Sequence, residues 1–383
     1  MRVVYNSFNG RYADNPRAVF EALRVQRPGW EHVWLADPRH RADFPVEVAT
    51  VPVAGVGATA ALEQADLIVA NCHLTLAPWR KRPGTRYLQT WHGTPLKRIH
   101  RSAVTVPAAA AMEELDEEIS RWDQLISPST AATALLRAAF GYAGPVLETG
   151  YPRNDLLAGP QAGARRAEVR ARLGVDEDTT VVLYAPTYRD DQVDADGALG
   201  LDPARLVATL VPGHVLLVRR HYYLGHHRVL PDRAAVRDVS GHPEIADLHL
   251  AADALVTDYS SAVFDFAVTG KPIVLYAYDL EHYRDRLRGF TLDLESEMPG
   301  PVVTQEAGLA AVLADLPGLT TAWAERYAAF RDRFCRFEDG HATERVLAAV
   351  RPLDQGPLDR GPLDQGALHQ GPLDQGPRPS TLA

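Results

Sequence analysis

The stretch QTWHGTPLKRI (residues 89–99) combines residue types that can activate a hydroxyl group. His92 follows a β-rich run and precedes Gly93. An imidazole at a strand end can act as a general base near neutral pH, Trp91 can supply a wall, and Gly93 can let a substrate approach the backbone. The alternative is a structural histidine in an ordinary turn, because Gly and Pro mark turns and a tryptophan often fills a core.

The stretch ADALVTDYSSAVFDF (252–266) combines features of a phosphate site. A buried strand runs into Asp258-Tyr259-Ser260-Ser261, and the residues that follow are apolar at helical spacing. Ser260 and Ser261 would therefore lie at a helix N-terminus, where backbone N–H groups, hydroxyls and the helix dipole favour a phosphate or diphosphate. The alternative is an ordinary serine cap, which contributes about 1 kcal/mol.

Two further strand ends carry cations. VLLVRRHYY (215–223) places Arg219, Arg220 and His221 after a buried strand, and VVLYAPTYRDD (181–191) places Arg189 after another. Guanidinium groups and an imidazole suit a polyanionic ligand, and His221 can donate a hydrogen bond or a proton to phosphate oxygens. A solvated basic loop and a plain strand exit are the alternatives.

The segment 80–101 contains seven Lys or Arg residues and no acid, although the chain has a formal charge of -9. This local reversal of sign predicts a landing surface for a polyphosphate or an anionic membrane, with a solvated rim as the alternative. The acidic total argues against a general nucleic-acid binder, which normally has a basic surface.

Short β-branched or aromatic runs alternate with helix-like stretches along the chain, which predicts parallel, doubly wound sheets. Strand-like runs include RVVYN, HVWLA, VEVATV, LIVAN and RYLQTW in the first part and VVLYAPT, VLLVRRH, ALVTD and PIVLYAY in the second. The pattern restarts after a polar, Gly-containing segment near residues 158–166. We therefore expect an α/β domain at 1–160 and another at 161–350, with a cleft between them at the carboxyl ends of the strands.

Residues 351–383 form an imperfect five-residue repeat rich in Pro and Gly, which predicts a disordered tail.

Other patterns argue against dinucleotide binding, P-loop nucleotide hydrolysis, α/β-hydrolase chemistry and zinc proteolysis. GVGATA (55–60) matches GxGxxA but does not open the first βαβ unit, and no P-loop, GxSxG or HExxH motif occurs. The two cysteines lack metal-type spacing, and no apolar run approaches a membrane span or a signal peptide.

These motifs resemble the CDP-glycerol glycerophosphotransferase family, the teichoic-acid polymerases and primases. The resemblance rests on QTWHGTPLKRI, YAPTYRD, LLVRRHYY, the segment 243–290, MPGPVV and the opening VVYNSFNGRYADNPRAVFEAL. It spans residues 1 to about 350 in the same order and leaves only the repeat tail outside. It implies a GT-B type fold with two Rossmann-like domains, the acceptor site mostly in the first and the donor nucleotide in the second.

The resemblance also implies a reaction and a location. The family transfers glycerol phosphate from CDP-glycerol to a hydroxyl of a lipid-linked acceptor or a growing poly(glycerol phosphate), releasing CMP. Its members work as peripheral proteins at the cytoplasmic face of the membrane, so an anionic membrane surface is an expected partner. No cofactor or resident metal is expected beyond the donor substrate, and a need for Mg²⁺ stays open.

By family analogy, His92 would deprotonate the acceptor hydroxyl, and His221 would stabilise the donor diphosphate or protonate the departing CMP. The donor-binding residues would be Arg189, Arg219, Thr257, Asp258, Ser260 and Ser261. The acceptor-binding residues would be Trp91, Gly93, Thr94, Lys97 and Arg98.

The chain departs from the family pattern in two ways. Arg220 stands where an apolar residue is expected, and the motifs begin at residue 1, which implies that the membrane-binding extension of larger members is absent. Three other functions stay open: ribitol-phosphate transfer, since those enzymes share the motifs; sugar transfer by a GT-B glycosyltransferase; and a non-catalytic scaffold that binds anionic polymer.

Overall fold

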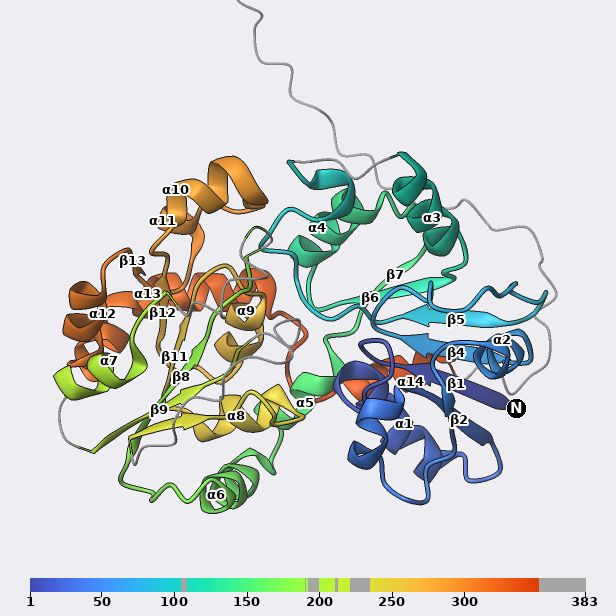
Figure 1. The fold of residues 1–383 in the computed structure, drawn as a ribbon, viewed down its shortest axis with the longest axis horizontal. Coiled ribbons are helices and arrows are strands. Elements are labelled where there is room, and N and C mark those ends of the chain that lie inside the picture. The colour runs from blue at the N-terminus through green and yellow to red at the C-terminus, as the bar shows by residue number, and fades with distance from the viewer. Residues whose placement is uncertain (105–108, 190, 192–199, 211–212, 221–234, 351–383) are drawn as a thin grey trace, which may run out of the picture.

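Two parallel β-sheets, each covered by helices, make up the computed structural model (Figure 1), which describes residues 1–104, 109–189, 191, 200–210, 213–220 and 235–350. The first sheet has the order β3-β2-β1-β4-β5-β6-β7 and the second the order β10-β9-β8-β11-β12-β13. Both are doubly wound, as the alternation of strands and helices predicts. The predicted tail, 351–383, lies outside the described residues.

The central strands are buried along nearly their whole length, so they appear in the sequence as almost continuous apolar runs. The first sheet comprises β1 (Arg2–Asn6), β2 (Glu31–Ala36), β3 (Thr50–Pro52), β4 (Leu67–Ala70), β5 (Arg86–Gln89), β6 (Gln124–Ser127) and β7 (Val146–Glu148). The second comprises β8 (Thr180–Ala185), β9 (His214–Val218), β10 (Val236–Asp238), β11 (Ala254–Thr257), β12 (Ile273–Tyr276) and β13 (Val302–Val303).

Helices cover the faces of both sheets, and their ends follow local capping rules. In α4, the Ser129 hydroxyl accepts the Ala132 N–H at 3.1 Å, and the helix stops at Gly141 with a left-handed φ of 62°. Around the first sheet are α1 (Asp14–Gln26), α2 (Val56–Glu63), α3 (Ala109–Ser120), α4 (Thr130–Phe140) and α14 (Ala342–Val350). The others are α5 (Asp155–Ala158), α6 (Ala162–Arg172), α7 (Pro203–Thr209), α8 (Ile245–Ala251), α9 (Ala262–Ala267), α10 (Leu280–His282), α11 (Leu294–Glu297), α12 (Glu306–Leu313) and α13 (Leu316–Phe334).

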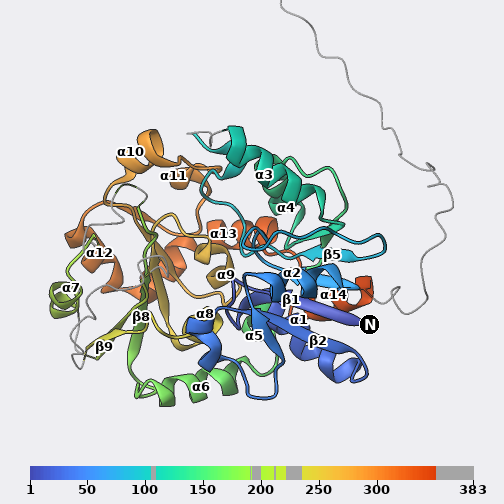
Figure 2. The ribbon, with the colours of Figure 1, turned by 45° about the vertical axis from the view of Figure 1, so that its right-hand side comes forward.

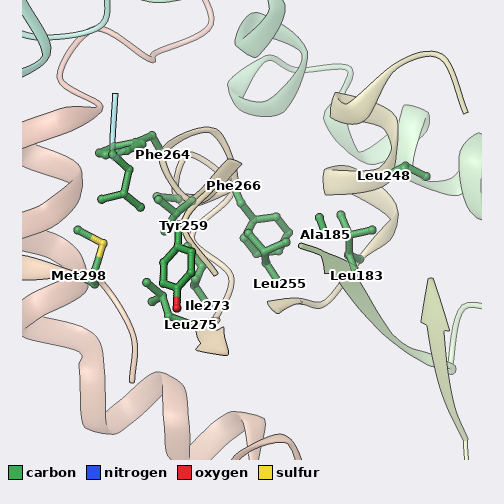
Figure 3. Packing of buried hydrophobic residues seen from close by; sticks show 14 of the residues in the cluster. Leu183, Ala185, Leu248, Leu255, Tyr259, Phe264, Phe266, Ile273, Leu275 and Met298 are labelled. Atoms are coloured by element: carbon green, nitrogen blue, oxygen red, sulfur yellow. The ribbon is translucent and has the colours of Figure 1, made fainter. Parts of the chain in front are cut away.

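The second sheet separates two hydrophobic clusters, because successive strand residues point to opposite faces. Leu183, Leu255 and Leu275 point to one face, where they pack with Phe264 and Phe266 of α9 (Figure 3). Their strand neighbours, such as Val182 and Val256, point to the other face, toward α7 and α12. Leu96, from the loop after His92, is 1% exposed and belongs to the α9-side cluster. The loop that carries the candidate base is therefore anchored in the core of the second half.

The chain crosses between the two halves twice. After β7 it enters the second half through α5, and at its described end α14 returns to pack beside α1 on the first sheet (Figures 1 and 2). Val346, Leu347 and Val350 join the core cluster that contains Val3 and Tyr5. We therefore propose that the first unit consists of residues 1–160 together with α14.

Within the described part of the chain, no single helix is both long and apolar enough to span a membrane. The pair α12 and α13, bent by 95° at a break, passes that test by length and composition only. Cys72 and Cys335 are both free thiols.

Candidate active site

Each sheet reverses its strand order once, between β1 and β4 in the first and between β8 and β11 in the second. Ligands of such sheets bind outside the carboxyl ends of the strands at these points. At the first reversal, the Asn71 side chain donates to the Ser7 hydroxyl at 3.1 Å and accepts the Phe8 N–H at 2.9 Å. Polar groups thus tie the ends of β1 and β4 together.

His92 lies against this strand end in an orientation suited to a base. Its Nδ1 lies 2.5 Å from the Asn71 carbonyl oxygen, which can only accept, so Nδ1 carries the proton and Nε2 keeps its lone pair. Burial lowers the pKa of His92, a shift opposed by the Asn71 hydrogen bond and the Asp14 charge and reinforced by the cations Arg153 and Lys97. The imidazole is therefore neutral at neutral pH, as a general base must be.

Trp91 packs against His92, and its role as a wall of the acceptor site stays a prediction. Its ring stacks on the His92 ring with centroids 4.1 Å apart. Its backbone has a left-handed φ of 48°, which costs free energy in a residue other than glycine. Hydrogen bonds hold this conformation: the Trp91 N–H donates to Gln89 Oε1 at 2.9 Å, and the Trp91 carbonyl accepts from Asn15 Nδ2 at 3.1 Å.

Two further histidines lie behind Trp91. The rings of His73 and His100 lie 5.4 and 5.7 Å from the Trp91 ring, and their Nε2 atoms are 3.4 Å apart. Burial lowers the pKa of His73 to about 3 and that of His100 to about 4. Sequence reasoning missed both, although the position of His73 three residues after a buried strand was a usable signal.

At the second reversal, between β8 and β11, two residues predicted to bind the donor nucleotide connect the ends of the strands. The Thr257 hydroxyl donates to the Ala185 carbonyl at 2.7 Å. One oxygen of Asp258 accepts the backbone N–H groups of Thr187 and Tyr259 at 2.8 and 2.6 Å. Thr257 and Asp258 therefore shape the loops around the predicted donor position.

Arg189 is paired within the protein. Its guanidinium donates to Asp258 at 2.9 Å and to Asp279 at 2.7 and 2.8 Å, and it is 3% exposed. Three tyrosine rings surround it: those of Tyr259, Tyr278 and Tyr283. With its charge balanced by two carboxylates, Arg189 fixes Asp258, and its direct contact with the donor stays a prediction.

Arg219 and Arg220 differ in their partners. Arg219 donates to the His242 carbonyl at 2.7 Å, and among the described residues no carboxylate forms an ion pair with it. Burial lowers the pKa of Arg219 to about 10, so it stays charged and suits an anionic ligand. Arg220, the departure from the family pattern, pairs with Asp238 at 2.7 Å and supports the end of β9. His221 lies outside the described residues.

The two halves meet at Gly93 and Ser261. Helix α9 begins directly after the two serines, as the sequence predicts, and the Ser260 hydroxyl accepts the Ala262 N–H at 3.2 Å. The Ser261 side chain makes no capping hydrogen bond. A Cβ atom on Gly93 would lie only 2.6 Å from Ser261 Oγ, and Gly93 has a φ of 152°. The structure thus brings the candidate base and the serine pair together.

Thr94, Lys97 and Arg98 follow Gly93 along the contact between the two halves. Thr94 is fully buried, and its Oγ1 has no hydrogen-bond partner within the described ranges. Lys97 forms an isolated antiparallel bridge with Phe290, and Arg98 donates its Nε–H to the Phe290 carbonyl at 2.8 Å. Their predicted contact with acceptor phosphates stays a prediction.

The basic segment 80–101 is partly neutralised by acids from elsewhere in the chain. Its ion pairs are Lys81 with Asp123 at 2.5 Å, Arg82 with Asp66 at 2.8 Å and Arg101 with Asp116 at 2.5 Å. The positive surface is therefore smaller than the sequence predicts. Among the side chains that the structure describes, no three His, Cys, Asp or Glu residues are grouped to hold a metal ion.

Comparisons with known proteins identify the family and agree with the fold. The family model of CDP-Glycerol:Poly(glycerophosphate) glycerophosphotransferase matches residues 1–351. The chain is 34% identical over 361 residues to the teichoic acid poly(glycerol phosphate) polymerase of Bacillus subtilis (strain 168), covering 91% of this chain and 48% of that protein. It thus spans about half the length of this relative.

A second relative matches over nearly its full length. The chain is 34% identical over 371 residues to the teichoic acid glycerol-phosphate transferase of Staphylococcus aureus (strain NCTC 8325 / PS 47), covering 91% of this chain and 92% of that protein. A solved structure of the wall teichoic acid polymerase TagF superimposes with a TM-score of 0.82 at 31% identity, covering 92% of this chain and 89% of that one. This likeness confirms the GT-B type fold.

Proposed function

The chain belongs to the CDP-glycerol:poly(glycerophosphate) glycerophosphotransferase family, and on this premise we propose that it transfers glycerol phosphate from CDP-glycerol to a hydroxyl of a lipid-linked or poly(glycerol phosphate) acceptor, releasing CMP. The observation that carries the proposal is the position of His92. Its Nδ1–H is fixed by the Asn71 carbonyl, and the next residue, Gly93, touches Ser261 at the start of α9. The candidate base and the candidate phosphate-binding serines thus lie at one point, which supports the proposal.

In the proposed reaction, His92 Nε2 takes the proton of the acceptor hydroxyl. The acceptor oxygen then forms a bond to the phosphorus that carries glycerol, and the bond from that phosphorus to the CMP oxygen breaks. CMP leaves as an anion while the proton stays on the imidazole. The Asn71 carbonyl stabilises the resulting imidazolium, because it already accepts the Nδ1–H.

On the donor side, Arg219, Ser260 and Ser261 stabilise the diphosphate. Phosphoryl transfer needs mainly positioning and charge stabilisation from the protein. The charge of Arg219 is not balanced by an ion pair in the described structure, and the Ser261 hydroxyl makes no capping bond. Both groups are therefore suited to phosphate oxygens, and Thr257 and Asp258 hold the strand ends beneath them.

On the acceptor side, we infer that the protein binds the inner face of the membrane peripherally through cations of the basic segment. Arg80 and Arg86 have no ion-pair partner within the described residues, and Leu76 nearby is 47% exposed. Flotation with vesicles containing anionic lipid tests this inference. We expect binding that falls with salt and with the double variant Arg80→Ser, Arg86→Ser, and an absence of binding to anionic vesicles would contradict it.

CMP release from CDP-glycerol tests the main proposal, with CDP-ribitol and a UDP-sugar in parallel and a synthetic lipid-linked glycerol-phosphate acceptor. We expect acceptor-dependent CMP from CDP-glycerol. Glycerol is favoured over ribitol, because the glycerol-phosphate polymerases and transferase are 33–34% identical to this chain, whereas the ribitol-phosphate enzymes are 26–27% identical, as are the glycerol-phosphate primases. CMP from CDP-ribitol alone would identify the sister activity, UDP would indicate sugar transfer, and intact donors would favour a scaffold.

His92→Ala tests the role of the base in this assay. A positioned base contributes about 10²- to 10⁴-fold, so kcat of the folded variant should fall by that amount. Activity within a few-fold of the parent in a folded variant would remove His92 from the role of base.

A further inference from the structure

A buried network next to His92 joins the two halves and includes none of the site residues assigned above. Its centre is Arg153, in the short 3-10 helix Pro152–Asn154, where the chain leaves the first sheet. The Arg153 side chain is only 2% exposed. A buried guanidinium must be paired, because an uncompensated charge inside a protein is strongly destabilising.

Arg153 is paired with one carboxylate from each half. Its Nη1 lies 3.2 Å from both oxygens of Asp14, the first residue of α1. Its Nη2 donates to both oxygens of Asp265, in α9, at 2.9 and 3.0 Å. The two terminal nitrogens of one planar guanidinium thus hold the two carboxylates in a fixed relation to each other. Arg153 therefore sets the position of α9 relative to α1.

Asn15 connects this network to the candidate base. Its Nδ2 donates to the Trp91 carbonyl, and its Oδ1 accepts the backbone N–H of Arg153, both at 3.1 Å. Trp91 directly precedes His92 and has the strained φ described above. One side of the network thus holds the backbone from which the His92 imidazole projects.

The other side of the network holds the serine pair. Asp265 lies one helical turn after Ser261. Arg153 Nη2 would lie 4.0 Å from a Cβ on Gly93, the same position that lies 2.6 Å from Ser261 Oγ. A shift of α9 away from Arg153 would therefore open the contact between Gly93 and Ser261.

We propose that Arg153 is a positioning residue for the transfer reaction, which holds the serine end of α9 against Gly93 so that donor phosphate and base meet in line. The inference rests on the proposed function. The Arg153 side chain acts through Asp265 on the donor side and through Asp14 at the start of α1 on the acceptor side, where the Arg153 backbone N–H also holds Asn15. Catalysis depends on such alignment, since a misplacement of about 1 Å can cost about 10²-fold in rate.

Asp265→Asn is the informative variant. It removes the carboxylate of α9 from the network and leaves Arg153 balanced by Asp14, so the folded state is largely preserved. We expect kcat to fall about 10²-fold while the affinity for CDP, measured by calorimetry, changes little. Arg153→Lys keeps the charge but replaces the two nitrogens Nη1 and Nη2 by one, which cannot take both of their positions, so we expect it to lose activity as well.

Asp247→Asn is the matched control. Asp247 is 3% exposed and accepts two bonds of 2.7 Å from Arg165, and this pair joins α6 to α8 within the second half. Asp247 also lies 3.1 Å from His242 Nε2, a hydrogen bond that the amide oxygen of Asn can still accept, so the variant keeps the support of His242. We expect kcat of this variant to stay close to that of the parent. Equal losses in Asp265→Asn and Asp247→Asn, or a kcat of Asp265→Asn close to the parent value, would overturn the proposal.

If the parent itself releases no CMP, the proposed function fails, and hydrogen exchange then decides the role of Arg153 without any turnover. Asp265→Asn should speed amide exchange in both the 89–99 and the 258–267 segments, and Asp247→Asn should change neither. Unchanged exchange in Asp265→Asn would show that Arg153 does not hold the two segments together.

Discussion

Gly93→Ala tests the contact between the two halves most directly. An added Cβ would lie 2.6 Å from Ser261 Oγ and 2.8 Å from Ser261 Cβ, both well inside an ordinary contact. Restoring 3.4 Å requires the two segments to separate by about 0.8 Å. Because a misplacement of about 1 Å costs about 10²-fold, kcat/KM should fall by about two orders of magnitude, or about 2.7 kcal/mol in the barrier.

The variant also strains the backbone, since a φ of 152° is rare in any residue with a side chain. Urea unfolding should therefore show a loss of about 1–3 kcal/mol in the free energy of unfolding. CMP release measured without urea, where the variant is still folded, separates this loss of stability from the effect on catalysis. Full activity of Gly93→Ala would refute the reasoning, because Gly93 and Ser261 could not then be in contact in the working enzyme.

A double-mutant cycle with Ser261→Gly assigns the cause of the catalytic loss. Removing the Ser261 side chain relieves the overlap, so Gly93→Ala should cost much less in the Ser261→Gly background than in the parent. Ser261→Gly alone measures the value of the hydroxyl. Strictly additive effects would show that backbone strain, and not the side-chain contact, accounts for the loss.

Three further predictions concern the base, the donor site and the packing of the loop that carries Leu96. Because burial lowers the pKa of His92 and the neutral imidazole is the active form, kcat/KM should rise with pH through an apparent pKa below about 6.5 and then stay level; a limb centred above pH 7 would contradict this. Arg219→Met should weaken CDP binding in calorimetry at least tenfold, since a hydrogen bond to a charged group contributes about 1.5–3 kcal/mol; unchanged affinity would exclude the contact. Leu96→Ala should lower the free energy of unfolding by about 2–5 kcal/mol in a urea titration, and a loss below 1 kcal/mol would show that the loop is not packed in the second core.

Much of the fold could be predicted because parallel strands buried on both faces leave near-continuous apolar runs. RVVYN coincides with β1, and LIVAN contains all of β4. The run VEVATV misled, because only Thr50–Pro52 forms a strand there and Val46 is 91% exposed. β3 lies at the edge of the sheet and is less buried than the central strands, so its sequence predicts its bounds less well. β-branched residues alone do not ensure that a segment pairs with a neighbouring strand.

The return of α14 to the first sheet could not be predicted from local pattern. Its apolar spacing indicates an amphipathic helix but does not say which sheet it covers. The core cluster places Val346 and Leu347 with Val3 and Tyr5, more than 300 residues earlier in the chain. Such pairings depend on the tertiary fold.

Sequence motifs could locate the candidate site, but they could not predict which side chains its residues pair with. The strand ends that carry His92, Arg219 and the serine pair could be located, because parallel strands present their carboxyl ends at one edge. The charge balance of Arg189 could not, since its carboxylates come from 69 and 90 residues away. The same limit explains why the basic segment 80–101 is less positive than its sequence indicates.

The loop after the base imposes one physical constraint on both catalysis and packing. His92 is held by the first sheet through the Asn71 carbonyl, whereas the Leu96 carbonyl accepts the Thr291 N–H of the second half at 2.9 Å. Only Gly93, Thr94 and Pro95 separate the two anchors. Any separation of the halves must therefore pull on the His92 backbone, and a glycine at 93 is the residue best able to absorb that change. The packing that joins the halves thus also sets the position of the base.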